Sequence, residues 1–193
     1  MTTQMIAAIC LMAWLIWETL WDFRDQNLPV WFSLVPLIGG LIYRIALGDW
    51  PAALFVALVV ASTNLSNPVW RLPALGVLGA VALVNLPAAW LPLIAGVALS
   101  DVLFELGVMG GADALAVIYV LTWFPSWQAL AAMLAGTLIV ATALLVARHG
   151  WRAPLQFVNA LRGKSAPTEA PGIAGFALGL AGFIVYRALP LVH

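Results

Sequence analysis

The sequence predicts an all-α protein, a polytopic bundle of transmembrane helices. Three observations lead to this class: 64% of the 193 residues are hydrophobic, only 8% are charged, and Pro, Gly or charged residues divide the chain into apolar segments. A soluble globule needs more polar surface than this composition supplies. The formal net charge is zero and there is no basic tail, so nothing indicates a nucleic-acid partner. The lipid bilayer is the expected surrounding.

The apolar segments predict about eight spans, since a perpendicular transmembrane helix needs roughly 20 residues and tilted or buried ones need fewer. They cover residues 5–21, 30–47, 51–62, 73–86, 88–106, 112–124, 127–147 and 172–189. The third, fourth and sixth are short, so they are tilted, protein-buried or re-entrant helices. We expect about eight spans, with about six as the alternative, in a single membrane domain over residues 1–193.

Basic residues predict the orientation. With every segment crossing, Arg44 and Arg187 fall on one side of the membrane and the other basic residues on the opposite side. Because cytoplasmic loops carry an excess of Lys and Arg, the second side is cytoplasmic and the N-terminus lies outside. The basic residues on this cytoplasmic side are Arg24, Arg71, Arg148, Arg152, Arg162 and Lys164. Residues 148–171 then form a cytoplasmic basic loop, in which Leu155, Val158 and Leu161 favour a short helix lying on the membrane surface.

Tryptophans near the segment ends predict an aromatic belt at both interfaces. Those expected in the belt are Trp21, Trp31, Trp70 and Trp151 at cytoplasmic ends and Trp50, Trp90, Trp123 and Trp127 at outer turns. The single Cys10 has no partner for a disulfide or a thiolate zinc site, so we expect it to pack. His149 and His193 lie far from any partner for a zinc site or a Ser–His pair. No metal and no other cofactor is predicted.

Two aspartates fall on the cytoplasmic side although residues 23–112 separate them. Asp22 ends the first segment, and Asp113 follows Gly110 and Gly111 at the start of the sixth. The glycines allow a tight turn or a close approach of the backbone to a substrate. Paired carboxylates can hydrolyse an amide without a metal, one as general base and the other as general acid. The sequence therefore predicts a carboxylate dyad.

Three short motifs resemble those of one family. "DFRDQNLPVW", residues 22–31, resembles the D-x-R-x-x-x-I-P-N-W stretch of prepilin peptidases, and "GGADAL", residues 110–115, resembles their G-x-G-D signature. "PGIAGFALG", residues 171–179, resembles P-F-G-P-F-L-A-L-G before the last helix. On these motifs the sequence resembles the prepilin and preflagellin peptidases, which are GxGD-type intramembrane aspartyl proteases. The resemblance is to the minimal form that lacks the cysteine-rich methyltransferase domain.

The resemblance implies an aspartic endopeptidase in the cell membrane, without N-methyltransferase activity. It would cleave the short basic leader of type IV pilin-like or archaellin-like precursor proteins at the cytoplasmic membrane face. Asp22 and Asp113 would be the catalytic pair, because counting back from Pro29 in the family motif reaches Asp22 rather than Asp25. The residues that would complete the motifs are Arg24, Pro29, Gly110, Gly111 and Ala112.

The sequence also departs from the family motifs. Ala112 stands where the family usually has Gly, Leu115 where it has Lys, and Val30 where it has Asn. Without that Lys, either an ionised Asp113 relies on the N-terminus of its own helix or the activity is altered. A helix C-terminus disfavours negative charge, so we expect Asp22 to be the resting acid and Asp113 the base.

The remaining acidic residues leave alternatives open. Asp101 and Glu105 are spaced i, i+4 and share a helix face. Together with Asp25 they either contact the basic leader of a substrate or are solvated charges at the interface. Glu18 lies one turn before Asp22. It either shares a proton with Asp22, faces water, or has a structural role, and we favour the structural role. Asp49 is expected to be a solvated loop residue.

Two other classes of function compete with the peptidase. In a proton- or cation-coupled transporter component, Asp22, Asp101 and Glu105 would relay protons or bind a cation. That class predicts inverted repeats and interrupted helices at the midplane, whereas the acidic residues here gather toward one side. In a non-catalytic subunit of a pilus or secretion machine, substitution of Asp22 or Asp113 would leave assembly intact.

Overall fold

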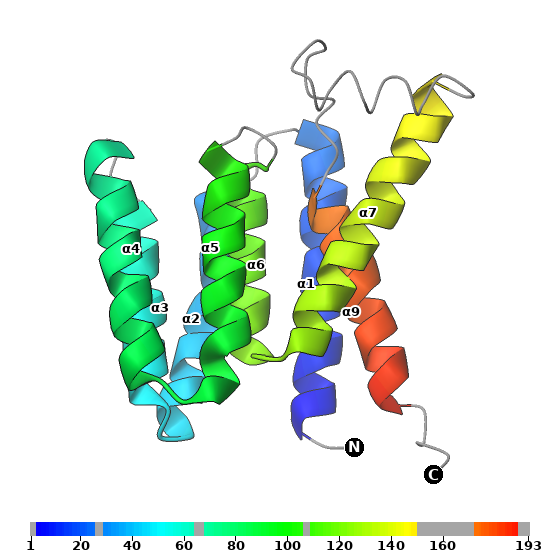
Figure 1. Cartoon of the computed structure of the whole chain (residues 1–193). Coiled ribbons are helices and arrows are strands. Elements are labelled where there is room, and N and C mark those ends of the chain that lie inside the picture. Colours follow the sequence, from blue (N-terminus) through cyan, green and yellow to red (C-terminus); the bar gives the residue numbers. More distant parts are fainter. Residues whose placement is uncertain (1–2, 26–28, 64–67, 106–108, 150–171, 189–193) are drawn as a thin grey trace.

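The computed structural model describes residues 3–25, 29–63, 68–105, 109–149 and 172–188, and within them the chain forms eight α-helices, one short 3₁₀ helix and no strand. The helices are α1 (Thr3–Asp25), α2 (Val30–Ala46), α3 (Trp50–Thr63), α4 (Pro68–Asn85), α5 (Leu91–Glu105), α6 (Gly111–Trp123), α7 (Trp127–His149) and α9 (Gly172–Ala188), with η1 (Ala88–Trp90) before α5. Successive helices run in opposite directions across one bundle (Figure 1).

The all-helical prediction is confirmed, and each predicted segment contains one α-helix. Among the described residues, three apolar helical stretches are long enough to span a membrane: Gln4–Asp22, Ala88–Glu105 and Trp127–Leu144. They indicate a membrane protein. The fourth segment was predicted to begin at Pro73, but α4 begins at Pro68 and contains Pro73. A proline at the first helical position costs little because its missing N–H would have no intrahelical acceptor there.

Helix α6 lies inside the bundle, where it packs on α2, α3, α5 and α9. Every residue from Ala116 to Thr122 is buried, so this part of the helix has no face left for solvent or lipid. A helix that is apolar all round is typical of such a position. The shortness and uniform apolarity of the sixth segment are thus explained by burial among neighbouring helices.

Helices α7 and α9 pack with their backbones in contact. A Cβ atom built at Gly136 of α7 would overlap the backbone of Gly175 and Gly179 in α9, and one built at Gly179 would overlap the backbone of Ala132 and Met133. Gly175 and Gly179 are four residues apart and therefore share a face of α9. Small residues at this spacing allow the close approach on which helix packing in membranes depends.

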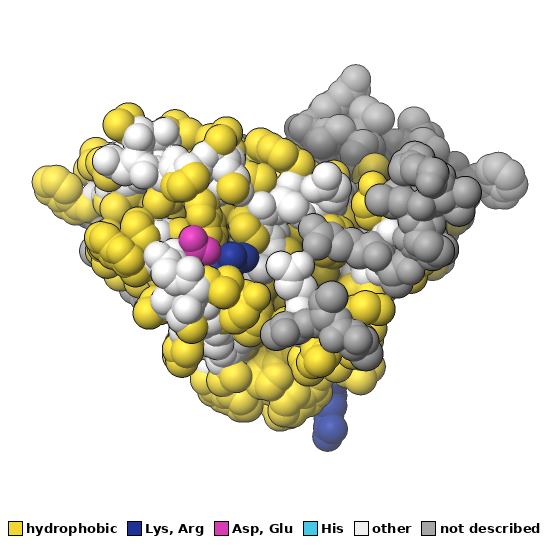
Figure 2. Space-filling view, turned by 90° about the horizontal axis from the view of Figure 1, so that it is seen from below, with side chains coloured by type: hydrophobic (Ala, Val, Ile, Leu, Met, Phe, Trp, Pro, Cys, Tyr) yellow, Lys and Arg dark blue, Asp and Glu magenta, His cyan; other side chains and the backbone are white. Residues whose placement is uncertain are grey.

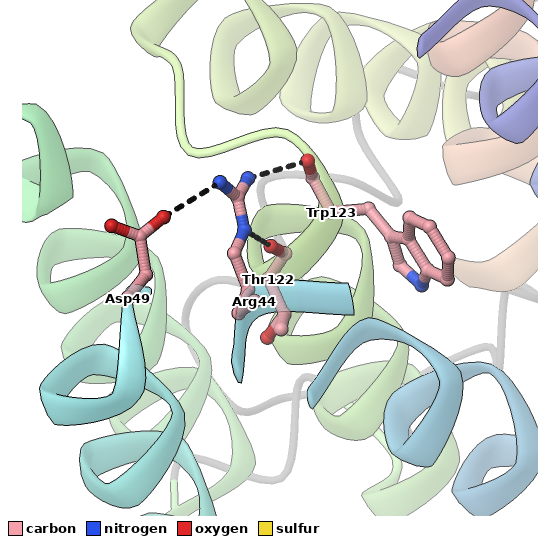
Figure 3. Close-up of polar contacts among 4 residues, drawn as sticks. All are labelled: Arg44, Asp49, Thr122 and Trp123. Carbon is pink, nitrogen blue, oxygen red and sulfur yellow. Dashed lines mark hydrogen bonds and ion pairs between the residues drawn. The ribbon is translucent and has the colours of Figure 1, made fainter. Parts of the chain in front are cut away.

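Arg44, at the end of α2, closes the C-terminus of α6 (Figure 3). Its Nε donates to the carbonyl oxygen of Thr122 and its Nη2 to that of Trp123, each at 2.7 Å, while Nη1 pairs with Asp49 at 3.3 Å. The guanidinium neutralises the negative end of the helix dipole. The end of the bundle at which α2 finishes is otherwise largely hydrophobic, with a small charged spot (Figure 2). Asp49 was wrongly predicted to be merely solvated.

Arg44→Lys is expected to lower the free energy of unfolding by about 1 to 2 kcal/mol, because an ammonium group cannot serve two carbonyls and a carboxylate with the same geometry. Thermal unfolding in detergent checks this. Arg24→Lys, the same change at an exposed side chain, serves as the control and should leave the unfolding midpoint in place. Equal midpoints for both variants would show that the Arg44 contacts contribute no net stability.

Most of the tryptophans predicted for the aromatic belt have the exposure that such a belt requires. Trp31, Trp50, Trp70 and Trp127 are exposed and Trp21 is partly exposed, whereas Trp151 lies outside the described residues. The prediction was wrong for Trp90. Trp90 is buried with its ring 4.8 Å below the Arg44 guanidinium, and Trp123 is partly buried and donates to the carbonyl oxygen of Pro36 at 2.8 Å. Cys10 was predicted to pack, yet it is exposed.

Candidate active site

The alternating helix directions bring the C-terminus of α1 to the same end of the bundle as the N-termini of α6 and α9 (Figure 1). Asp22 lies in the last turn of α1 and Asp113 in the first turn of α6. The two carboxylates are close enough for the charge of Asp22 to act on Asp113. Two acidic residues from distant parts of the sequence therefore lie at the same end of the bundle, within electrostatic reach of each other, as the dyad hypothesis requires.

Asp113 is held by backbone donors from two helix N-termini. Its Oδ2 accepts from the N–H of Gly110, just before α6, at 3.2 Å, and its Oδ1 accepts from the N–H of Ile173, in the first turn of α9, at 2.9 Å. Both N–H groups belong to helix turns that leave donors unpaired within the helix. The N-terminus of its own helix, as predicted, therefore supplies one donor to Asp113, and the N-terminus of α9 supplies the other.

Ile173 was missed as a site residue at the sequence level. Its side chain is ordinary core, 1% exposed, and only its backbone N–H has a role at the site. The signal that could have found it is the third motif, "PGIAGFALG", which begins α9 and brings that helix start to Asp113. The motif was noted for its similarity to the family and not for the donors that a helix start provides.

The other motif residues belong to helix ends at the same end of the bundle. Arg24 is exposed, and the side chain of Asp25 lies outside the described residues. Pro29 precedes α2 in an extended conformation, so the chain turns back where predicted. Gly110 has φ −76°, a value open to any residue, and Gly111 has only Phe104 near its missing Cβ, at 3.7 Å. Neither glycine is needed for the turn, and both are exposed beside Asp113.

Glu18 is fully buried one turn before Asp22. Its Oε2 accepts from the Tyr119 hydroxyl of α6 at 2.5 Å, and its Oε1 accepts from Trp14 Nε1 at 3.2 Å and from the Ser33 hydroxyl of α2 at 3.5 Å. These contacts join α1, α2 and α6 just below the dyad. The arrangement agrees with the structural role that we favoured, because it fixes α1 against the helix that carries Asp113.

Tyr119→Phe is expected to lower the free energy of unfolding by about 1 to 3 kcal/mol, because it removes a donor from a buried carboxyl group. Glu18→Gln keeps the size of the side chain and should lose less, since its amide can still accept from Trp14. Thermal unfolding in detergent checks both. Tyr186→Phe, at an exposed tyrosine of α9, is the control. A Tyr119→Phe variant as stable as this control would contradict the role of the cluster.

Asp101 and Glu105 lie on α5 at the same end of the bundle. Glu105 forms an ion pair with Arg71 of α4, whose guanidinium lies 5.0 Å from the Phe104 ring. Asp101 also lies within the electrostatic reach of Arg71. Glu105 is therefore not a separate solvated charge. Within the described residues, Arg71 is thus close to both carboxylates of this group.

A cavity of about 260 Å³ lies next to the first turns of α6, between that helix and α2 to α5. The residues that line it are Ser33, Val59, Thr63, Arg71, Leu75, Val97, Ser100, Asp101, Phe104, Gly111, Ala112, Ala114, Leu115 and Ile118. Most are apolar, and the charged ones belong to the end of the bundle that holds the dyad. Leu115, which stands in place of the lysine of the family motif, lines this cavity.

Comparison with known proteins identifies no relative. No family model matches the chain, and no curated protein or solved structure matches it. Within the part of the chain that the structure describes, no group of three or more His, Cys, Asp or Glu is placed to hold a metal ion. A function must therefore be inferred from the residues of the site.

Proposed function

We propose that the protein is an intramembrane aspartyl endopeptidase that cleaves the short basic leader of type IV pilin-like or archaellin-like precursors. The observation that carries this proposal is the position of Asp22 and Asp113 at the same end of the helix bundle, within electrostatic reach of each other. It is supported by the three motifs, all of which contribute to that end: Asp22 from the first, Asp113 from the second and the Ile173 N–H from the third.

In the proposed membrane arrangement all eight helices cross the bilayer, with the dyad at the cytoplasmic face and the N-terminus outside. The alternating helix directions support it, since Arg24 and Arg71 then share the side of the dyad while Arg44 lies on the opposite side (Figure 1). The short helix α6 can be accommodated because its neighbours bury it. In the six-span alternative, one pair of short helices enters the membrane without crossing it.

The dyad would hydrolyse the peptide bond with one shared proton, because two carboxylates that act on one substrate atom repel each other when both are ionised. Asp113 takes a proton from a water molecule as the water oxygen bonds to the peptide carbonyl carbon. Asp22 donates its proton to the carbonyl oxygen. In the breakdown of the tetrahedral intermediate the C–N bond breaks, the leaving nitrogen takes the proton held by Asp113, and the hydroxyl proton returns to Asp22. The products are a carboxylic acid and an amine, with the dyad restored.

The hydrogen bonds of Asp113 fit the role of base. Both of its oxygens accept from backbone N–H groups, an arrangement that suits a carboxylate rather than a donating carboxyl group. Asp22 lies in a last helical turn, where the dipole disfavours negative charge. Asp25, Asp101 and Glu105, which belong to helix ends at this end of the bundle, are the proposed contacts of the basic leader.

The proposal is tested with membranes that contain the wild-type protein and a panel of pilin-like and archaellin-like precursors, each with a basic leader before an apolar segment. We expect a shortened product whose mass places the cut at the junction of the two parts, with no N-methylation of the new terminus. If no precursor in the panel is cut while the protein is present and folded, the peptidase proposal is wrong. The non-catalytic subunit and transporter component then become the leading functions.

A further inference from the structure

We infer that Glu18 is a buried proton-binding site, which exchanges its proton with the cavity beside α6 through the hydroxyl group of Ser33. The inference goes beyond the proposed function, because it does not depend on whether the protein cuts a peptide. Its first support is the position of Glu18, which is fully buried in a bundle of apolar helices. A charged carboxylate is costly to bury, and an ionisable group at such a place in a membrane protein is commonly functional.

Two of the three hydrogen-bond partners of Glu18 suit either state of its carboxyl group. Tyr119, at 2.5 Å, and Ser33, at 3.5 Å, contact it through hydroxyl groups. A hydroxyl group can donate a hydrogen bond or accept one, whereas the indole N–H of Trp14 only donates. Both hydroxyl groups donate to a carboxylate, and one of them can turn and accept from a neutral carboxyl group. The added proton then has a partner without movement of any helix.

The charge of an ionised Glu18 has no opposite charge beside it among the described residues. Its described partners include no cation, and the other charge that acts on it is that of Asp113. Asp22 and the exposed Arg24 follow on α1 itself. Helices α2 and α9 pack on α1, and their titratable side chains that the structure describes lie in last turns at the opposite end of the bundle: Tyr43, Arg44 and Tyr186. Protonation of Glu18 therefore removes an uncompensated buried charge.

The cavity beside α6 connects this group to solvent. Ser33 lines the cavity, and so does Asp101, whose side chain is partly exposed. The volume of about 260 Å³ has room for several water molecules. Thr63 and Ser100 add hydroxyl groups to the lining, and the buried Nε of Arg71 has no hydrogen-bond partner within the described residues. These groups supply the two or more polar partners that a buried water molecule needs.

The proton moves along this path without a change in any bond between heavy atoms. A hydronium ion in the cavity gives a proton to Ser33 Oγ and becomes water, while the original hydroxyl proton of Ser33 passes to the Glu18 carboxylate. Release follows the reverse order. The distance of 3.5 Å between Ser33 Oγ and Glu18 Oε1 is long for a hydrogen bond, so the hydroxyl group is held weakly and can turn between Glu18 and the cavity.

Infrared spectroscopy of the protein in vesicles of neutral lipid tests the site, because a protonated carboxyl group has its own C=O band. The glutamates of the chain are Glu18, Glu105 and Glu169, and isotope-labelled glutamate separates their bands from those of the aspartates. We expect a labelled band that persists in the Glu105→Gln/Glu169→Gln double variant, is missing in Glu18→Gln, and weakens as the pH is raised. The double variant leaves Glu18 as the single glutamate, so the test holds even if Glu18→Gln fails to fold. A double variant with no such band, or with a band of constant intensity over the pH range in which the protein stays folded, overturns the inference.

Ser33→Val and Ser33→Thr test the route, since the two new side chains have the same branched shape and differ in the hydroxyl group. After a rapid change from H₂O to D₂O buffer, the Glu18 band shifts as deuterium replaces the proton. We expect this exchange to be about 100-fold slower in Ser33→Val than in Ser33→Thr, the lower end of the contribution of a positioned proton-transferring group. Equal exchange rates in the two variants overturn the route through Ser33. Neither measurement uses cleavage, so both stand apart from the test of the peptidase proposal.

Discussion

Asp113→Asn is expected to lower the rate of precursor cleavage by about 10²- to 10⁴-fold, the contribution of a general base in a positioned site. An asparagine can keep the shape of the side chain and accept one backbone N–H through its amide oxygen, but it cannot take a proton from water. Asp22→Asn should lower the rate to a similar extent, because an amide cannot donate a proton as a carboxyl group does. The two effects should not add, since the carboxylates act as one unit.

The measurement is the initial rate of cleavage by each variant in membranes with matched amounts of protein. Asp49→Asn is the control, because it makes the same chemical change to a carboxylate that pairs with Arg44 at the end of α2. It should retain the wild-type rate within a few-fold. Full cleavage by either dyad variant would rule out that residue as catalytic, and stable assembly without any cleavage by the wild type would favour the scaffold function.

The helices could be predicted because their signals are local. Apolar runs divided by Pro, Gly and charge mark each of the eight helices, and alternation of their directions then brings Asp22 and Asp113 to one end. The start of α4 was misplaced because Pro73 was treated as a boundary, although a helix that has already begun at Pro68 continues through it.

The partners of the site residues could not be predicted, since each comes from a distant part of the sequence. The Tyr119 hydroxyl donates a hydrogen bond to Glu18, and the Ile173 N–H donates one to Asp113. Nothing in the sequence of these apolar helices distinguishes either donor from its neighbours. The prediction for Trp90 was wrong for a similar reason. It follows a proline turn between two apolar segments, as an interfacial tryptophan would, but the Arg44 guanidinium covers it. Sequence position alone does not separate an exposed aromatic residue from a covered one.

Gly179→Ala is expected to lower the free energy of unfolding by about 3 kcal/mol, the upper part of the range for overpacking a close-packed interface. The added methyl group would overlap the backbone of Ala132 and Met133, and backbone atoms cannot move aside as a side chain can. Helices α7 and α9 would have to separate along their contact. Gly175→Ala should act in the same way through the backbone of Thr137.

Gly182→Ala is the matched control on α9, because a Cβ at that position meets nothing within 4 Å. Alanine favours the helix by about 1 kcal/mol over glycine, so this variant should be slightly more stable than the wild type. Thermal unfolding in detergent should thus give shifts of opposite sign for two identical substitutions three residues apart. Shifts of the same sign would show that α7 and α9 are not in backbone contact. Because α9 also brings the Ile173 N–H to Asp113, any Gly179→Ala protein that still folds should cleave precursor more slowly, whereas Gly182→Ala should not.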